Sequence, residues 1–127
     1  MSHSVLVVED DEHVRRLLCD MVSLMGFSSV EAVDGQDALR KLQQQKPDIM
    51  LLDVMMPEMD GIALCKTLRN EEETADLPII MLSVQSRPFA ILEGLRAGAD
   101  RYLTKPTGID ELTGHINDLL GERRLEV

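Results

Sequence analysis

The chain has 127 residues, of which 44% are hydrophobic and 28% charged, a composition typical of one globular domain and too short for two. Its formal net charge of -10 argues against binding of a nucleic-acid backbone, which depends on lysine and arginine neutralising phosphates. The longest apolar runs, such as residues 5–8 and 49–52, are far shorter than the roughly 20 residues that cross a bilayer. We therefore expect one domain over residues 1–127, with no membrane span and no secretion signal, in the cytoplasm.

The first half of the chain alternates between short apolar runs and helical periodicity. Residues 5–8 form an unbroken apolar run typical of a buried strand. Apolar residues then recur every three or four positions, which predicts an amphipathic helix with a buried face made of Val14, Leu17, Leu18, Met21, Val22 and Met25. Gly26 is placed to cap that helix, and residues 28–33 predict a second strand. The next helix is expected to carry Ala38, Leu39 and Leu42 on one face.

The second half repeats the alternation. Residues 49–52 are apolar without interruption, as expected for a central parallel strand that is covered on both faces. Asp60 and Gly61 open a third helix, and residues 78–82 and 101–103 predict two more strands. The helix between those strands is expected to stop at Gly98 and to place on its apolar face Ala90, Ile91 and Leu95. The final helix is marked by Leu112, Ile116, Leu119 and Leu120.

Five strand-helix units in a row predict an α/β fold. The connections are helical, which calls for a doubly wound five-stranded parallel sheet with helices on both faces. The expected strand order is the flavodoxin-like 2-1-3-4-5, which leaves the second strand at an edge. In such sheets ligands bind at the carboxyl ends of the strands.

Polar residues follow four of the five predicted strands. Glu9 and Asp10 follow the first, Asp53 the third, Ser83 the fourth and Lys105 the fifth. Like charges this close would repel each other by about 4 kcal/mol per pair at an effective dielectric of 20, so the acids favour a bound cation. All the ligands are oxygens, so the sequence predicts a hard cation, with Mg²⁺ preferred.

A carboxylate beside a metal, a lysine and a hydroxyl is also what phosphoryl transfer requires. Asp53 is the candidate nucleophile, because it comes at the end of the most apolar strand. Lys105 would place a positive charge on a phosphoryl oxygen, and the Ser83 hydroxyl would donate a hydrogen bond to another.

The motifs that carry this chemistry resemble the response-regulator receiver family of two-component signalling, including its single-domain chemotaxis regulators. They are Val-Val-Glu-Asp-Asp at 7–11, Leu-Leu-Asp-Val-Met-Met-Pro-Glu-Met-Asp-Gly at 51–61, Ser83, and Gly-Ala-Asp-Arg-Tyr-Leu-Thr-Lys-Pro at 98–106. The resemblance covers essentially the whole chain. Each motif alone is weak, but four in the right order, each at the end of a strand, are specific.

The resemblance implies a ligand set and a switch. Asp10, Asp53 and the backbone carbonyl of Met55 would bind Mg²⁺ directly, Mn²⁺ could substitute, and Glu9 would act mainly through water. Ser83 and Tyr102 would form the switch pair, with the hydroxyl moving toward the phosphoryl group and the ring turning inward. The peptide bond between Lys105 and Pro106 is expected to be cis.

The resemblance also implies partners. A sensor histidine kinase, a phosphotransfer protein or a small phosphodonor would phosphorylate Asp53. A downstream effector protein or effector domain would bind the face formed by the fourth helix, fifth strand and fifth helix, and a homodimer on phosphorylation is compatible with the family. Both a free-standing receiver and a receiver within a longer protein are compatible with the sequence.

Three alternative functions fit the sequence less well. A haloacid-dehalogenase-type phosphatase would need a second acid two residues after the nucleophile, where this chain has Met55, so we expect a switch that catalyses only its own phosphorylation and dephosphorylation. A flavodoxin would need a phosphate loop where three acids stand. A receiver-like module that works without phosphorylation would usually lack an acid or the lysine. Asp11 and Asp60 are expected to be helix caps.

Overall fold

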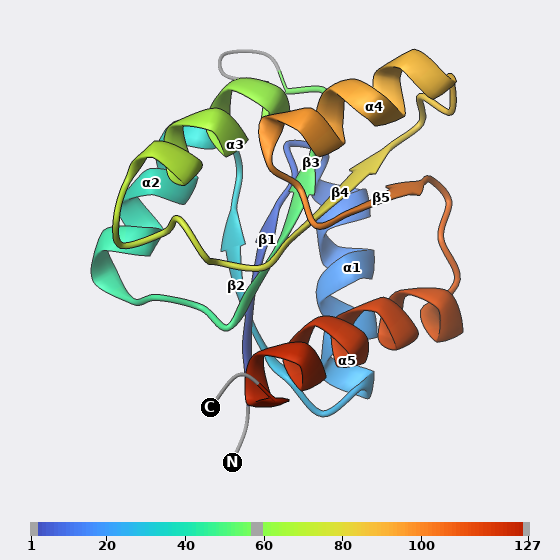
Figure 1. Ribbon diagram of the computed structural model, residues 1–127. Helices are drawn as coiled ribbons and strands as arrows, with labels where there is room; N and C mark the ends of the chain where they lie inside the picture. Colours follow the sequence, from blue (N-terminus) through green and yellow to red (C-terminus); the bar gives the residue numbers. More distant parts are fainter. Residues whose placement is uncertain (1–2, 57–59, 126–127) are drawn as a thin grey trace.

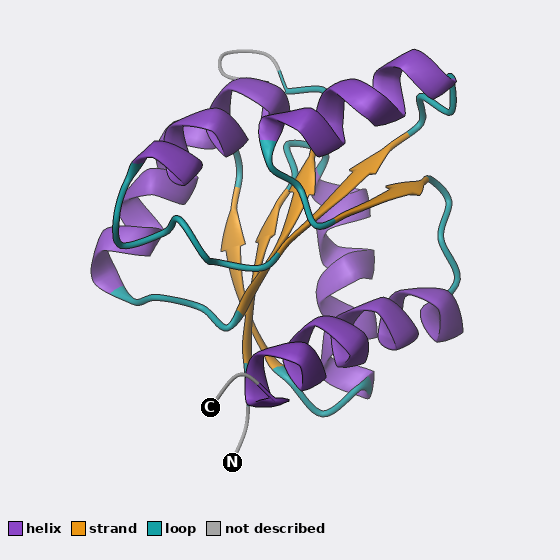
Figure 2. Cartoon of the chain, in the orientation of Figure 1, coloured by secondary structure: helices purple, strands orange, loops and turns teal. Residues whose placement is uncertain are grey.

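A computed structural model describes residues 3–56 and 60–125, so Pro57, Glu58 and Met59 of the 51–61 motif lie outside the described residues. Strands and helices alternate along the chain (Figures 1 and 2). The strands are β1 (Ser4–Val8), β2 (Ser28–Ala32), β3 (Ile49–Asp53), β4 (Ile79–Ser83) and β5 (Arg101–Thr104). The helices are α1 (Glu12–Leu24), α2 (Gly35–Gln44), α3 (Gly61–Asn70), α4 (Pro88–Ala97) and α5 (Ile109–Leu125).

The five strands form one parallel sheet in the order β2-β1-β3-β4-β5, which confirms the predicted fold. The main difference in boundaries is at β2, which ends at Ala32 although the sequence predicts strand through Val33. The Val33 amide donates a hydrogen bond to the Asp37 carboxylate (3.0 Å). Val33 therefore belongs to the turn into α2, and its side chain is exposed.

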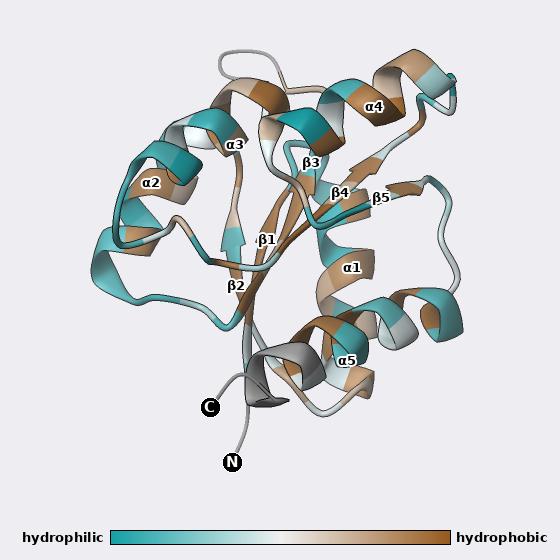
Figure 3. Ribbon diagram, in the orientation of Figure 1, coloured by the Kyte–Doolittle hydropathy of each residue, from teal (hydrophilic) through white to brown (hydrophobic). Residues whose placement is uncertain are grey.

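Each face of the sheet is covered by its own set of helices (Figure 1). Side chains alternate along a strand, so Leu6 and Val8 pack with α2, α3 and α4, whereas Val5 and Val7 pack with α1 and α5. All residues of β3 and β4 are buried, and Figure 3 shows that hydrophobic residues are concentrated on these central strands. The ends of β3 and β4 are therefore held rigidly by packing on both sides.

The helix starts follow the capping chemistry expected from the sequence. The Asp11 carboxylate accepts hydrogen bonds from the amides of His13 (2.9 Å) and Val14, and the Asp60 carboxylate accepts one from the amide of Ala63 (2.7 Å). Both predicted caps are confirmed. At the other end of α4, Gly98 has φ of 119°, a left-handed conformation that glycine adopts readily.

Two leucines that were predicted to face the core are exposed. Leu17 on α1 is 59% exposed, and Leu95 on α4 is 42% exposed. The buried stripe of α4 is made of Gly94 and Ala97, because α4 approaches the sheet closely; a Cβ on Gly94 would lie 2.8 Å from the ring of Tyr102. Within the described residues, no helix is long and apolar enough to cross a membrane.

Candidate functional site

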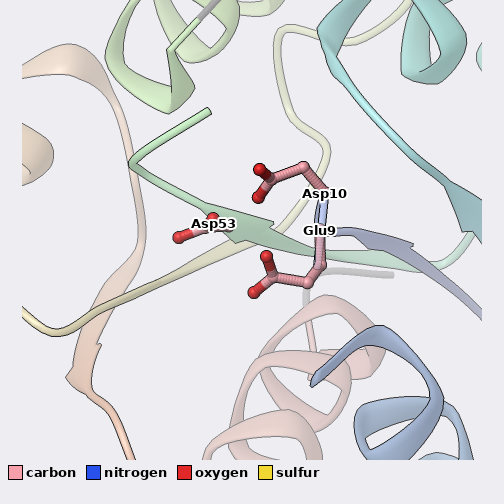
Figure 4. A group of neighbouring side chains, drawn as sticks. All are labelled: Glu9, Asp10 and Asp53. Atoms are coloured by element: carbon pink, nitrogen blue, oxygen red, sulfur yellow. The ribbon is translucent and has the colours of Figure 1, made fainter. Parts of the chain in front are cut away.

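The carboxyl ends of β1 and β3 bring three acidic side chains together (Figure 4). Oxygens of Glu9, Asp10 and Asp53 all lie within 4.8 Å of one another, and the three carboxylates point to the same side of the strand ends. Glu9 and Asp53 are almost completely buried, with 2% and 6% of their surface exposed, whereas Asp10 is exposed. The cluster thus has two anchored carboxylates and one that faces solvent.

The sheet positions these acids through its backbone. Val8 on β1 lies opposite Leu52 on β3, so the residues that follow them emerge side by side. Beyond the end of β1 the Glu9 amide donates to the carbonyl of Ala32 (3.1 Å), and beyond β3 the Val54 amide donates to the carbonyl of Leu82 (3.1 Å). Both acidic segments are therefore fixed by hydrogen bonds to neighbouring strands before any side chain contributes.

Lys105 is the cation of the cluster. Its Nζ lies between the two buried acids, donating to Glu9 Oε1 and to Asp53 Oδ1 (3.2 Å). Its amide donates to the carbonyl of Ser83 (2.8 Å), and its peptide bond to Pro106 is cis, as expected. Burial alone would lower the pKa of Lys105, but the hydrogen bond with Glu9 and the charge of Asp53 raise the pKa overall, so this amine stays protonated.

One ammonium group does not balance three carboxylates. Although the Asp10 side chain is exposed, partial desolvation of its carboxyl group, followed by the hydrogen bond and negative charge of Glu9, raises the pKa of Asp10 above its ordinary value. A raised carboxyl pKa means that the ionised form is disfavoured there, which is the effect a bound cation would reverse. The donors are all hard oxygens, so this cluster suits a small divalent cation such as Mg²⁺.

The buried carboxylates also accept hydrogen bonds from backbone amides. The Met55 amide donates to Asp53 Oδ1 (3.3 Å), and the Asp11 amide donates to Glu9 Oε2 (3.1 Å). The Met55 side chain points outward and is 54% exposed. Met55 therefore contacts the Asp53 carboxylate through its backbone amide.

Ser83 and Tyr102 are connected through the backbone of Gln85, a link that sequence analysis did not predict. Ser83 is fully buried, and its Oγ accepts a hydrogen bond from the amide of Gln85 (3.1 Å). The hydroxyl of the half-buried Tyr102 donates to the carbonyl of the same Gln85 (3.0 Å). Because only the backbone of Gln85 takes part, no residue type in the sequence signals this link.

Arg15 is a second residue that sequence analysis missed. Its Nη1 donates to the backbone carbonyl of Glu9 (2.9 Å), while its Nε donates to the Glu31 carboxylate at 3.0 Å. Arg15 therefore fixes the backbone that carries the acids. Its place one helical turn after Asp11, directly behind an acidic loop, is the signal that could have identified it.

An apolar groove adjoins the cluster between α1 and the turn after β5. It encloses about 300 Å³ and is lined by Val14, Leu17, Leu18, Met21, Leu82, Val84, Lys105, Pro106 and Thr107. Two exposed members of this lining, Leu17 and Val84, are 59% and 65% exposed. Leu17, which the sequence predicts to face the core, thus forms part of an apolar surface that ends at Lys105.

Comparison with known proteins adds the family context. A sequence model described as the response regulator receiver domain matches residues 5–117. Curated relatives include the alkaline phosphatase synthesis transcriptional regulatory protein PhoP of Bacillus subtilis, 39% identical over all of this chain and 51% of that protein. They also include the response regulator MprA of Mycobacterium ulcerans, 40% identical over 99% of this chain and 53% of that protein. The chain thus spans about half the length of the curated relatives it matches.

Solved structures of response-regulator proteins have the same fold as this chain. The receiver domain of the Francisella response regulator 1452 superposes with a TM-score of 0.88 and 35% identity, covering 96% of this chain and 99% of that one. The chemotaxis protein CheY4 of Vibrio cholerae superposes with a TM-score of 0.88 and 29% identity, covering 94% and 99%.

Proposed function

Because the chain belongs to the response-regulator receiver family, we propose that it is a phosphoacceptor switch whose acceptor is Asp53. The observation that carries the proposal is the buried Asp53 carboxylate at the end of β3, in contact with Lys105 and clustered with Glu9 and Asp10. A carboxylate oxygen of Asp53 forms a bond to phosphorus as the bond between phosphorus and the donor's nitrogen or oxygen breaks. The leaving group keeps the electron pair; a histidine nitrogen can then take a proton from solvent, whereas acetate leaves as its anion.

The acidic cluster is proposed to hold Mg²⁺, with Mn²⁺ able to substitute. Asp10, Asp53 and the backbone carbonyl of Met55 would be direct ligands, and Glu9 would act mainly through water. When bound, the cation neutralises charge on the phosphoryl oxygens. The close grouping of the three carboxylates and the raised pKa of Asp10 support this assignment.

Lys105 and Ser83 are proposed to act on the other phosphoryl oxygens. The Lys105 amine contacts Asp53 Oδ1, so it is placed to donate to an oxygen of a group carried by that carboxylate. Ser83 would reorient its hydroxyl from Gln85 toward the phosphoryl group. The Gln85 carbonyl also accepts a hydrogen bond from Tyr102, so this movement would change the position of the tyrosine ring. Ser83 and Tyr102 would thus act as the switch pair.

The phosphodonor is proposed to be a sensor histidine kinase, a phosphotransfer protein or a small phosphodonor. The apolar groove beside Lys105 supports a protein donor, because exposed Leu17 and Val84 offer a surface that a helix could cover next to Asp53. The acids that surround Asp53 disfavour anionic donors without a cation, which agrees with a dependence on Mg²⁺.

The output is proposed to be protein contact and not turnover of a substrate. The receiver would catalyse only its own phosphorylation and dephosphorylation, in the cytoplasm, and Met55 provides no side-chain acid for rapid hydrolysis. The relatives are about twice as long as this chain, so an effector domain or separate effector is expected to contact the α4–β5–α5 face, with a homodimer as one form of that contact.

The test is intact-mass spectrometry after incubation with acetyl phosphate, with Mg²⁺ and with a chelator. We expect a gain of one phosphoryl group that requires Mg²⁺ and that Asp53→Asn abolishes. The matched control is Asp76→Asn, which removes an exposed carboxylate that pairs with Lys46 away from the cluster. Uptake that persists in Asp53→Asn, or that does not depend on a divalent cation, would overturn the proposal.

A further inference from the structure

A second groove lies between α3 and α4, which run side by side (Figure 1). It encloses about 240 Å³ and is lined by Lys66, Phe89, Leu92, Glu93, Arg96 and Ala97. Phe89 is 77% exposed and Leu92, one helical turn later, is 43% exposed. A large aromatic side chain that is left this open, beside a leucine on the same helical face, is typical of a contact surface.

The cations around this groove differ from the others in the chain. Among the described side chains, Lys66, Arg87 and Arg96 are the basic residues for which the structure gives no acidic or other partner, although acidic residues outnumber basic ones by 23 to 13. Basic residues elsewhere do find carboxylates, as Arg15, Arg40 and Lys46 illustrate. Lys66 and Arg96 line the groove, and Arg87 lies at the amino end of α4. Two of these three cations therefore line the same groove as the exposed Phe89 and Leu92.

We propose that the α3–α4 groove binds an acidic, amphipathic helix of a partner protein. The apolar face of that helix would cover Phe89 and Leu92, and its carboxylates would pair with Lys66 and Arg96. Glu93 gives the groove a direction. Glu93 also lines an adjoining hollow with Asp60 and Met55, so this end of the groove is acidic. The carboxylates of the partner helix would be repelled there and would lie toward Lys66 and Arg96.

Charge argues against the other occupants of this groove. In a symmetric pair of chains the same groove would face itself, and Lys66 and Arg96 outnumber Glu93, so two copies would repel each other. Nucleic acid is disfavoured by the net charge of -10. The surface also differs from the α4–β5–α5 face, because its residues lie on the side of α4 that is turned to α3. The inference does not depend on phosphoryl transfer.

The test uses two synthetic helical peptides of about 18 residues, long enough for a helix to form on binding. Both carry leucine at helical spacing on one face, with glutamate on the remaining positions of one peptide and lysine on those of the other. Each is titrated into the intact ¹⁵N-labelled chain while amide chemical shifts are recorded. We expect the acidic peptide to shift the amides of Lys66, Leu92 and Arg96 and to bind more tightly than the basic peptide. The net charge of the chain would favour the opposite order, so this result requires a local basic surface.

Charge reversal supplies the control. Lys66→Glu combined with Arg96→Glu should weaken the acidic peptide at least tenfold, whereas Arg16→Glu combined with Lys46→Glu makes the same change in net charge elsewhere and should leave binding unchanged. Amide spectra of both variants check that they are folded. The inference is overturned if the acidic peptide produces no saturable shifts at millimolar concentration, or if both peptides bind equally. It is also overturned if the shifts map to the α4–β5–α5 face, or if sedimentation shows a dimer whose dissociation on dilution shifts the amides of Lys66, Leu92 and Arg96.

Discussion

Gly61 is the position at which a single methyl group should disturb both stability and the proposed acceptor site. A Cβ there would lie 2.6 Å from the backbone carbonyl oxygen of Asp53 and 2.8 Å from the Cα of Val54, whereas ordinary contact begins near 3.4 Å. The obstructing atoms are backbone, so they cannot rotate away. Gly61→Ala must therefore move α3 and the end of β3 apart by about 0.8 Å.

Overpacking of this kind costs about 1–3 kcal/mol, and the higher helix propensity of alanine offsets up to about 1 kcal/mol. We expect Gly61→Ala to lower the free energy of unfolding by about 1–2 kcal/mol. With a urea m-value of about 2 kcal/mol/M, the midpoint followed by circular dichroism should fall by roughly 0.5–1 M. Phosphoryl uptake by Asp53 should also slow, because its backbone is what moves.

The control is Gly114→Ala on α5, where an added Cβ meets nothing within 4 Å. That substitution should stabilise the protein by about 0.5–1 kcal/mol, since alanine replaces glycine in a helix. If Gly61→Ala were as stable as the wild type and took up phosphate at the same rate, the close approach of α3 to β3 would not constrain the site, and the reasoning would fail.

Further predictions follow from other contacts. The chain has one tyrosine and no tryptophan, so tyrosine fluorescence reports Tyr102 alone; acetyl phosphate with Mg²⁺ should change it in the wild type and not in Asp53→Asn, and an unchanged signal would rule out Tyr102 as a switch. Burial acts to raise the pKa of Asp37, but a backbone amide and a neighbouring guanidinium lower this pKa overall. The ionised Asp37 carboxylate therefore stabilises the fold above pH 3.8, the ordinary pKa of the group, and this contribution is lost as the pH falls below 3.8. Urea unfolding should therefore show Asp37→Asn to be less stable near pH 6, with the difference shrinking below pH 3.8; a difference that is the same at both pH values would contradict this. Arg69 donates to four backbone carbonyls and one carboxylate, so Arg69→Met should cost about 2–4 kcal/mol in the same assay, against less than about 0.5 kcal/mol for Lys46→Met in an exposed pair.

The fold could be predicted because its strongest signals are local. Residues 49–52 and 79–82 are continuous apolar runs, and the structure buries all of them between two layers of helices. The end of β2 could not be predicted, because Val33 has a strand-forming side chain but its amide is bonded to Asp37 in the next turn. Strand propensity depends on the residue type alone, whereas the end of β2 is set by the hydrogen bond between Val33 and Asp37.

Which residues of a helix face the core is harder to predict from sequence than the presence of the helix. The apolar stripes of α1 and α4 are wider than the surface that the sheet can cover, so some leucines remain outside. On α4 the close approach at Gly94 selects Ala97 for the core and leaves Leu95 exposed. Sequence periodicity counts Leu95 as core because it cannot register how near the helix lies to β5.

The grouping of Glu9, Asp10 and Asp53 could be anticipated, because parallel strands end at one edge of the sheet. The contacts that hold the group could not. Arg15 bonds to a backbone carbonyl, and Gln85 connects Ser83 to Tyr102 through its amide and carbonyl. Backbone groups are common to all residues, so only the folded chain reveals which of them take part.

The most direct test of the central claim is to locate the phosphoryl group on the chain. After Mg²⁺-dependent phosphorylation by acetyl phosphate, borohydride reduction converts an aspartyl phosphate into homoserine, which peptide mass mapping identifies at a single position. We predict homoserine at position 53, and none when Mg²⁺ is chelated before the reaction. Homoserine at another aspartate, or phosphate found on Ser83 with Asp53 intact, would contradict the account.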